Sequence, residues 1–246
     1  MIIKATDDFT KWASGYSGCN GDVTGNIWFC GIEYGGNEAE NEFQFTDASN
    51  PADIPDDFFK YQYNIKVAKI YATLRGEAVE NYSTVALRDN LFVHNSGVFK
   101  MNLYPISFHH DTDDLWPEWI YRKTGLPTKS IYRAWCQIYR FSEILKWVNK
   151  HSPKIIICTG ITYQNDFIMA FNGLEDLYKK DISKKTISGR DLVALNVNDD
   201  KTILVIIPFL GGTHGLNSDQ LLQVFGKEIQ NLCNSKFGNN CFSLLT

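Results

Sequence analysis

The sequence has no uninterrupted apolar stretch long enough to cross a lipid bilayer. Its first residues, MIIKATDDFTKW, also lack the apolar core and the small-residue cleavage site of a secretory signal peptide. We therefore expect a cytoplasmic protein that makes no contact with a membrane.

The cysteines lack the CxxC spacing that marks many zinc and iron–sulfur sites. Two of them, Cys30 and Cys158, end apolar runs, where small hydrophobic residues are common. We therefore expect reduced, buried thiols and neither a metal nor another cofactor. The six cysteines are Cys19, Cys30, Cys136, Cys158, Cys233 and Cys241.

An excess of positive charge is also lacking. Lysine and arginine number 24 against 28 acidic residues, which gives a net charge of −4 and a pI near 5.7. This balance excludes a global attraction to nucleic acid but leaves room for a local basic face. The densest basic cluster is KKDISKK, which contains Lys179, Lys180, Lys184 and Lys185. It predicts either a phosphate contact or a solvated surface.

Apolar runs and helical patterns alternate along the chain. This alternation predicts an α/β fold with a parallel sheet. We expect a single domain over residues 1–246, a three-layer sandwich whose central, mostly parallel four-stranded sheet has helices on both faces. Asn198–Asp200 predict a hairpin turn that adds an antiparallel edge strand. The four expected strands are Ile27–Cys30, Gly97–Leu103, Ile155–Thr159 and Ile203–Ile207, and the expected helices lie within 58–76, 128–151, 163–171 and 219–233.

Polar side chains that could bind a ligand or take part in catalysis follow the apolar runs. Ligands of open α/β sheets bind at the carboxyl ends of the strands, where this chain has GIEYGGNE, NLYPISFHH, TGITYQND and PFLGGTHGLNS. Gly31 and Gly35 allow the backbone to approach a ligand, and Glu33 between them is expected to point into a cleft. Asn102 offers donors and an acceptor in one plane, which suits the edge of a base.

These motifs resemble those of the uracil-DNA glycosylase superfamily. GIEYG matches the motif after the first strand, with Glu33 where the family has Asp or Asn and Tyr34 where it usually has proline. VFKMNLYPIS matches the motif with the base-reading asparagine, here Asn102, and IIICTG resembles the ending of the third strand. IIPFLGGTHGLNS resembles the last motif, with His214 in place of the histidine of a His-Pro-Ser core that this chain lacks.

The resemblance implies a DNA glycosylase that hydrolyses the bond between the sugar and uracil or another deaminated or damaged base. Glu33 would stabilise the cationic sugar and orient a water, and His214 would donate a hydrogen bond to the departing base. Asn102 would read the base edge. The aromatic residues expected against the base are Tyr34, Phe43 and Phe45, and those expected along the DNA backbone are Gly31, Gly35, Gly211, Gly212, Thr213 and Ser218.

Two other functions stay open. The same scaffold suits a hydrolase of free nucleosides or nucleotides, or a catalytically silent member that binds nucleic acid or protein. Each side chain also has a structural alternative, since Glu33 can be a surface carboxylate, Asn102 a partner of backbone groups and His214 an exposed loop residue. A glycosylase requires a basic groove that leads to its pocket, a small-molecule enzyme a closed pocket, and a silent binder permits a filled one.

Overall fold

The computed structural model describes residues 3–33, 35, 44–54, 58–108, 115–173, 182–238 and 242. Its strands are β1 (Asn20–Gly21), β2 (Ile27–Gly31), β3 (Val98–Asn102), β4 (Ile155–Thr159), β5 (Ser183–Ile187), β6 (Arg190–Val197) and β7 (Thr202–Ile207). Its α-helices are α1 (Asp7–Ser14), α2 (Gln62–Leu74), α3 (Tyr82–Arg88), α4 (Glu118–Thr124), α5 (Lys129–Trp135), α6 (Phe141–His151), α7 (Gln164–Asn172) and α8 (Asp219–Phe237). Cys136–Arg140 is a π-helical segment, and short 3₁₀ turns span Phe58–Lys60, Val79–Asn81 and Ile161–Tyr163.

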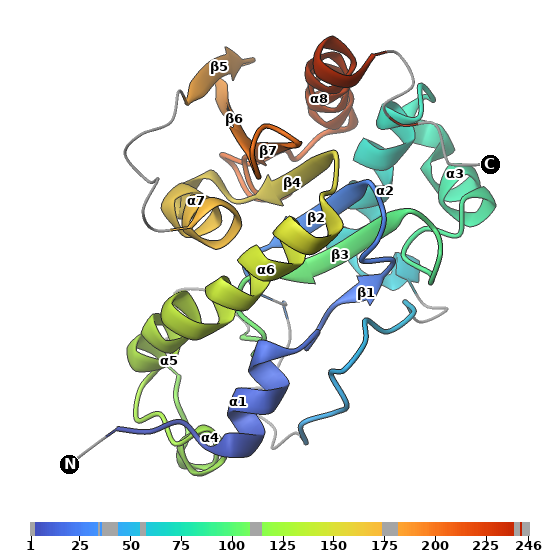
Figure 1. The fold of residues 1–246 in the computed structure, drawn as a ribbon. Coiled ribbons are helices and arrows are strands. Elements are labelled where there is room, and N and C mark those ends of the chain that lie inside the picture. Colours follow the sequence, from blue (N-terminus) through green and yellow to red (C-terminus); the bar gives the residue numbers. More distant parts are fainter. Residues whose placement is uncertain are drawn as a thin grey trace.

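The strands form one mixed sheet in the order β1-β3-β2-β4-β7-β6-β5 (Figure 1). Strand β2 pairs in parallel with β3 and with β4, and β4 pairs in parallel with β7. The outer pairs, β1 with β3, β6 with β7 and β5 with β6, are antiparallel. The α/β prediction is therefore confirmed, but over the described residues the sheet contains seven strands, more than we expected.

The predicted hairpin is present between β6 and β7, but the strand that it adds is not at the edge of the sheet, because β5 pairs with the other side of β6. Asn198, Asp199 and Asp200 form its turn, and all three have positive φ angles, which Asn and Asp tolerate better than most residues. Strands β1 and β5 were not predicted. β1 has two residues, and β5 reads SKKTI and is mostly exposed, so neither presents an apolar run.

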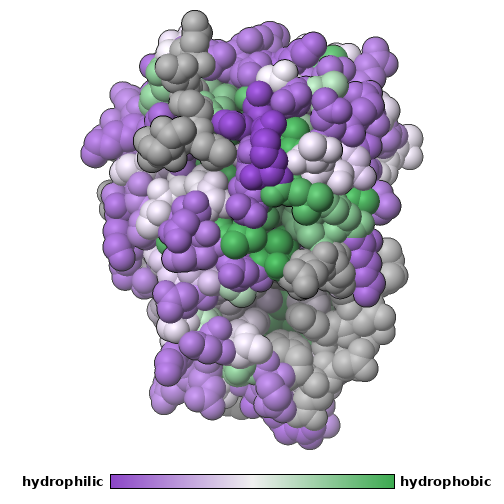
Figure 2. Space-filling view, turned by 90° about the vertical axis from the view of Figure 1, so that its right-hand side faces the viewer, coloured by the Kyte–Doolittle hydropathy of each residue, from purple (hydrophilic) through white to green (hydrophobic). Residues whose placement is uncertain are grey.

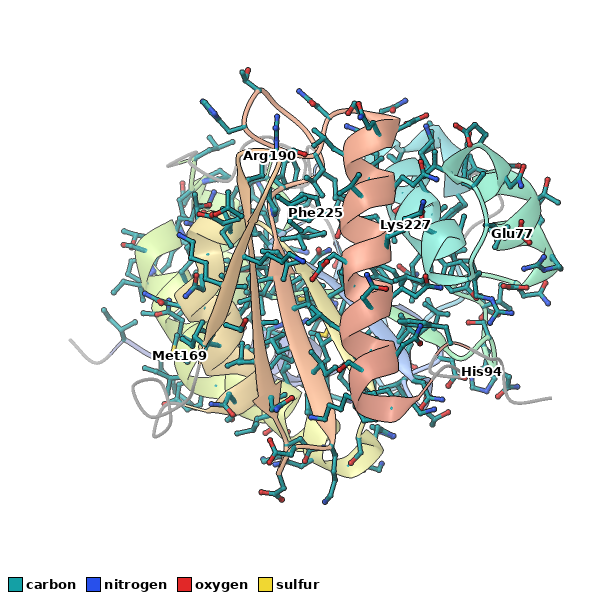
Figure 3. All side chains as sticks on the ribbon, turned by 90° about the horizontal axis from the view of Figure 1, so that it is seen from above. Glu77, His94, Met169, Arg190, Phe225 and Lys227 are labelled. Atoms are coloured by element: carbon teal, nitrogen blue, oxygen red, sulfur yellow. The ribbon has the colours of Figure 1, made fainter. Side chains whose placement is uncertain are left out.

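Helices cover both faces of the sheet. Alternate side chains of the central strands divide between two cores, because successive residues of a strand point to opposite faces. Trp28 and Cys30 pack on the side of α1 and of the α5–α7 region, whereas Ile27 and Phe29 pack on the side of α2, α3 and α8. Figure 3 shows α7, which carries Met169, and α8, which carries Phe225, on opposite sides of the strands.

The predicted long helix over 128–151 forms, with an interruption. Thr128 caps its start by accepting a hydrogen bond from the Ile131 amide at 3.2 Å. The π-helical segment then ends at Arg140, whose fully buried guanidinium donates to the Leu103 carbonyl at 2.8 Å and to the Asn102 carbonyl at 3.1 Å. This arginine ties the end of β3 to the helix layer.

The described cysteines are all buried, as predicted, and none of them forms a disulfide. Burial raises the pKa of Cys19 and of Cys136 to about 12, so both thiols are protonated at neutral pH. Within the described ranges no helix has the length and apolar character needed to cross a membrane. Figure 2 shows hydrophobic residues gathered in the middle of an otherwise mainly hydrophilic face.

Candidate functional site

A cavity of about 570 Å³ lies at the carboxyl ends of β2 and β3. Ligand pockets commonly measure about 300–1,000 Å³, so this cavity has room for a small molecule or a nucleobase. Ile54, Phe58, Tyr61, Tyr63 and Phe209 form its apolar and aromatic walls. Its polar lining residues are Asn20, Glu33, Gln62, Asn64, Lys100, Asn102 and Ser107, and Gly31, Ile32 and Gly35 complete the set.

Gly31 and Asn102 lie side by side, because they are register partners at the ends of β2 and β3. A Cβ atom on Gly31 would lie 2.2 Å from Oδ1 of Asn102 and 3.3 Å from the hydroxyl oxygen of Tyr63. Only glycine at position 31 therefore leaves the Asn102 amide in its place. The Tyr63 hydroxyl also lies 3.0 Å from Oγ1 of Thr159, so three neighbouring strand ends contribute to this corner.

Lys100 is a cavity residue that the sequence analysis missed. It precedes Asn102 by two positions on β3, so both side chains are on the same face of the sheet. Lys100 is 5% exposed, and its Nζ donates to Oδ1 of Asn64 at 2.8 Å. Burial lowers the pKa of Lys100 to about 8, because the charged ammonium is largely removed from water. The sequence signal that could have identified Lys100 is its position between apolar residues inside a buried strand.

Glu33 lines the cavity, as its position after β2 predicts, but its carboxylate also meets two cations of α5. Its side chain is 5% exposed and pairs with Nζ of Lys129 at 3.7 Å and with Nη2 of Arg133 at 3.4 Å. The guanidinium carbon of Arg133 lies 5.3 Å from the ring centroid of Tyr104 and 5.6 Å from that of Tyr163. A buried carboxylate with two such partners has a fixed position.

His214 is not brought to the cavity. It lies exposed in the loop between β7 and α8, of which Phe209 lines the cavity. Arg190 holds this loop from β6: its Nε donates to the Gly215 carbonyl at 2.8 Å and its Nη2 to the Thr213 carbonyl at 3.3 Å. In Figure 3 Arg190 lies at the end of the strands from which the loop leaves. Phe209, at the start of this loop, lines the cavity and is 52% exposed.

Of the other residues expected along a DNA backbone, some line the cavity and some lie outside it. Gly31 and Gly35 line the cavity, whereas Gly211, Gly212 and Thr213 belong to the loop that carries His214 and do not. Gly212 has a φ of +71°, a conformation that favours glycine. Ser218 accepts a hydrogen bond from the Leu221 amide at 3.3 Å and so caps α8, as the sequence predicts.

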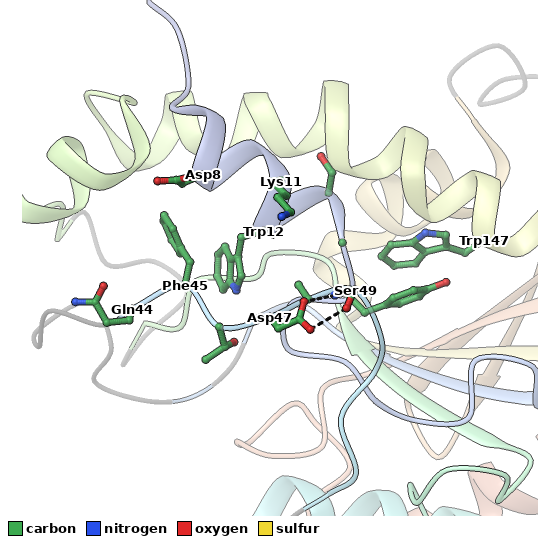
Figure 4. Close-up of a pocket in the computed structure, with 13 residues that line it drawn as sticks. Asp8, Lys11, Trp12, Gln44, Phe45, Asp47, Ser49 and Trp147 are labelled. Atoms are coloured by element: carbon green, nitrogen blue, oxygen red, sulfur yellow. Dashed lines mark hydrogen bonds between the residues drawn. The ribbon is translucent and has the colours of Figure 1, made fainter.

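Phe45 lies in a different hollow, of about 830 Å³, between α1, residues 44–49 and α6 (Figure 4). Its ring stacks on Trp12, with centroids 4.8 Å apart and planes at 27°. At the other end of the hollow Tyr16 stacks in the same way on Trp147, at 4.4 Å. Phe45 is therefore part of an aromatic cluster and does not line the Asn102 cavity. Tyr34 and Phe43 lie outside the described residues.

The described lysines of the basic cluster are on the edge strand β5 and face carboxylates. Lys184 pairs with Asp191 at 2.8 Å, and Lys185 pairs with Glu228 of α8 at 2.7 Å. Their ion pairs favour a structural role at the sheet edge over a grip on phosphate. Lys179 and Lys180 lie outside the described residues.

Among the residues with described positions, no group of three or more His, Cys, Asp and Glu side chains is arranged to hold a metal ion. No protein-family model matches the sequence, and no curated protein matches it. The chemistry of the cavity must therefore be inferred from its geometry.

Proposed function

We propose that this protein is an N-glycosyl hydrolase that binds a nucleobase in the Asn102 cavity and cleaves its bond to the sugar, on a fold of the uracil-DNA glycosylase type. The observation that carries the proposal is the convergence of the Gly31–Glu33 segment and Asn102 in one cavity at the ends of paired parallel strands. This is the place where an open α/β sheet binds its ligands. The adjoining parallel strands β3, β2, β4 and β7 form the proposed core.

The walls of the cavity suit a planar heterocycle. Phe58, Tyr61, Tyr63 and Phe209 supply aromatic surfaces, and Tyr61 and Phe209 are about half exposed, at 50% and 52%. A base that stacks on them gains about 1–3 kcal/mol. These residues take the stacking role that the sequence analysis gave to Phe43 and Phe45. The Asn102 amide then reads the edge of the base with a donor and an acceptor.

Glu33 supplies the electrostatic part of the reaction. The oxygen of a water molecule bonds to the anomeric carbon while the bond from that carbon to the base nitrogen breaks. The base leaves with the electron pair of that bond and takes up the proton that the water gives up, while the sugar passes through a cationic state that a nearby carboxylate stabilises. Lys129 and Arg133 hold the Glu33 carboxylate in position for this role.

Single-turnover assays on labelled oligonucleotides test the proposal. The substrates carry one uracil, either in a single strand or opposite guanine, and the variants are Glu33→Gln and the control Glu118→Gln. Glu118 is 79% exposed on α4, in an i,i+4 pair with Arg122, so its change should leave the rate unaltered. We expect base release by the wild type and a loss of roughly 10²-fold or more in Glu33→Gln. Equal rates in the two folded variants would remove Glu33 from the mechanism.

A hydrolase of free nucleosides is the second candidate. It is favoured by the net charge of −4 and by the ion pairs of Lys184 and Lys185, which leave these two lysines poor candidates for a DNA-binding groove. The same enzyme preparation is incubated with uridine and deoxyuridine, and free uracil is quantified by chromatography. Release from nucleosides without release from oligonucleotides would identify this second function; release from neither would refute hydrolysis of uracil glycosides altogether.

A further inference from the structure

Lys100 gives the cavity a property that neither the motifs nor the resemblance assigns. Its ammonium group has three N–H donors and no acceptor, whereas the neighbouring Asn102 amide has both. Lys100 and Asn102 are on one face of β3, about 7 Å apart along the strand at the usual rise per residue. Both line the same cavity, so one bound ligand can contact both of them.

We infer that Lys100 is the cationic group that contacts the base, so that the cavity selects bases with a carbonyl oxygen at that edge and stabilises the negative charge that such a base acquires on leaving. This inference rests on the proposed function and assigns to Lys100 the role that the resemblance gives to His214. His214 is exposed and does not line the cavity, whereas Lys100 is buried in its wall.

The surroundings of Lys100 keep its Nζ in place. Asn64 of α2 accepts a hydrogen bond from it at 2.8 Å, and the ring centroid of Tyr63 lies 5.8 Å away. A buried ammonium near a fixed acceptor keeps its orientation without a large loss of entropy when a ligand arrives. A ligand carbonyl would accept a charge-assisted hydrogen bond from Lys100. A ligand amino group would place its own N–H donors against those of Lys100 and form no hydrogen bond.

Lys100 is also the group expected to titrate here between pH 7 and pH 9. Its pKa is about 8. Burial raises the pKa of the nearby Cys19 to about 12, and burial likewise raises that of Tyr63 well above its usual value, so both groups are neutral in this range. Glu33 pairs with the two cations of α5. A ligand that needs the ammonium should therefore bind more weakly as the pH rises through 8.

Calorimetric binding of free uracil and free cytosine tests the inference without any need for catalysis. Cytosine carries an amino group where uracil carries one of its carbonyls, and the adjacent ring nitrogen of cytosine lacks the hydrogen that uracil has. At pH 7 we expect the wild type to prefer uracil by roughly ten- to a hundredfold, the value of one charge-assisted hydrogen bond. Between pH 7 and pH 9 its affinity for uracil should fall by up to about tenfold, following the charged fraction of a lysine with a pKa of about 8.

Lys100→Met should lose both the preference and the pH dependence, and Lys100→Arg should keep its charge at pH 9. Lys146→Met is the matched control, because Lys146 is 68% exposed and pairs with Glu143 on the surface of α6. The inference is overturned by wild-type affinity that is equal at pH 7 and 9, by unchanged preference in Lys100→Met, or by no binding of uracil. Uracil binding with this pattern but without base release from oligonucleotides or nucleosides would instead refute the proposed hydrolysis and leave the role of Lys100 in recognition standing.

Discussion

Replacing Lys100 with methionine should abolish the preference for uracil over cytosine and at the same time relieve an energetic cost in the folded protein. A lysine in water has a pKa of 10.5, and burial lowers that of Lys100 to about 8. At neutral pH the folded chain therefore holds a charged group in a site that disfavours it. Methionine fills a similar volume without the charge.

The size of the effect follows from these two pKa values. Their difference corresponds to about 3 kcal/mol of stability at pH 7, at about 1.4 kcal/mol for each tenfold change in an equilibrium constant. Methionine also removes the donor to Asn64 Oδ1, and a buried acceptor left without it costs about 1–3 kcal/mol. We expect Lys100→Met to lie between equal stability and a gain of about 2 kcal/mol at pH 7.

The pH dependence gives a sharper test, because the Asn64 contribution does not depend on pH. Between pH 8 and 10.5 the unfolded lysine keeps its proton while the folded Lys100 has lost it. The unfolded state then binds more protons, so raising the pH favours the folded state. From pH 7 to pH 10 the wild type should gain about 2–3 kcal/mol relative to Lys100→Met.

Urea unfolding at pH 7, 8, 9 and 10 measures this difference, with Lys146→Met as the control for loss of a surface charge. The control should run parallel to the wild type. A constant difference between wild type and Lys100→Met across this range would refute the burial argument. A loss of more than about 2 kcal/mol in Lys100→Met at pH 7 would show that its contacts outweigh the cost of its charge.

Two further substitutions test the geometry of the cavity and of the neighbouring hollow. Gly31→Ala should displace the Asn102 amide, since the new Cβ would lie 2.2 Å from its Oδ1. We expect at least a tenfold loss of uracil affinity, measured by calorimetry, and a destabilisation of about 1–3 kcal/mol, measured by urea unfolding. Phe45→Ala should cost about 1–3 kcal/mol of stability, because this partly buried ring loses its stacking on Trp12, but should leave uracil affinity unchanged. Phe209→Ala should weaken uracil binding with little loss of stability, and the reverse pattern would mean that the wrong aromatic residue is assigned to the site.

The central strands could be predicted because their signal is local. The runs IIICT and TILVII are apolar at every position but their threonines, which is typical of strands covered on both faces. β5 has no such signal: SKKTI is polar, and it becomes a strand because β6 offers it an edge. The π-helical segment before Arg140 was equally hidden, because the carbonyl groups that this arginine contacts come from β3 and from the segment after α1.

The candidate site could be predicted only in part, for a related reason. Gly31 and Asn102 end the strands β2 and β3, Glu33 follows β2, and the ends of paired parallel strands meet at one edge of the sheet. The direction of a loop depends on distant contacts, as with Arg190, which holds the loop that carries His214. Lys100 could not be predicted from the ends of the strands, because it lies inside β3.

The charges in and beside the cavity decide whether this acidic protein can attract an anionic ligand. The whole chain carries a net charge of −4, yet Lys100, Lys129 and Arg133 lie in or beside the cavity wall with Glu33. Three cations against one carboxylate make this local set positive, and charges at a cleft with low-dielectric walls act more strongly than exposed ones. From the charges of the described residues we therefore expect the cavity to attract an anionic ligand, or a base that becomes anionic as it leaves, although the protein as a whole carries a net negative charge. Because Lys100 loses its charge above pH 8, this attraction should weaken at alkaline pH by the same titration that stabilises the fold.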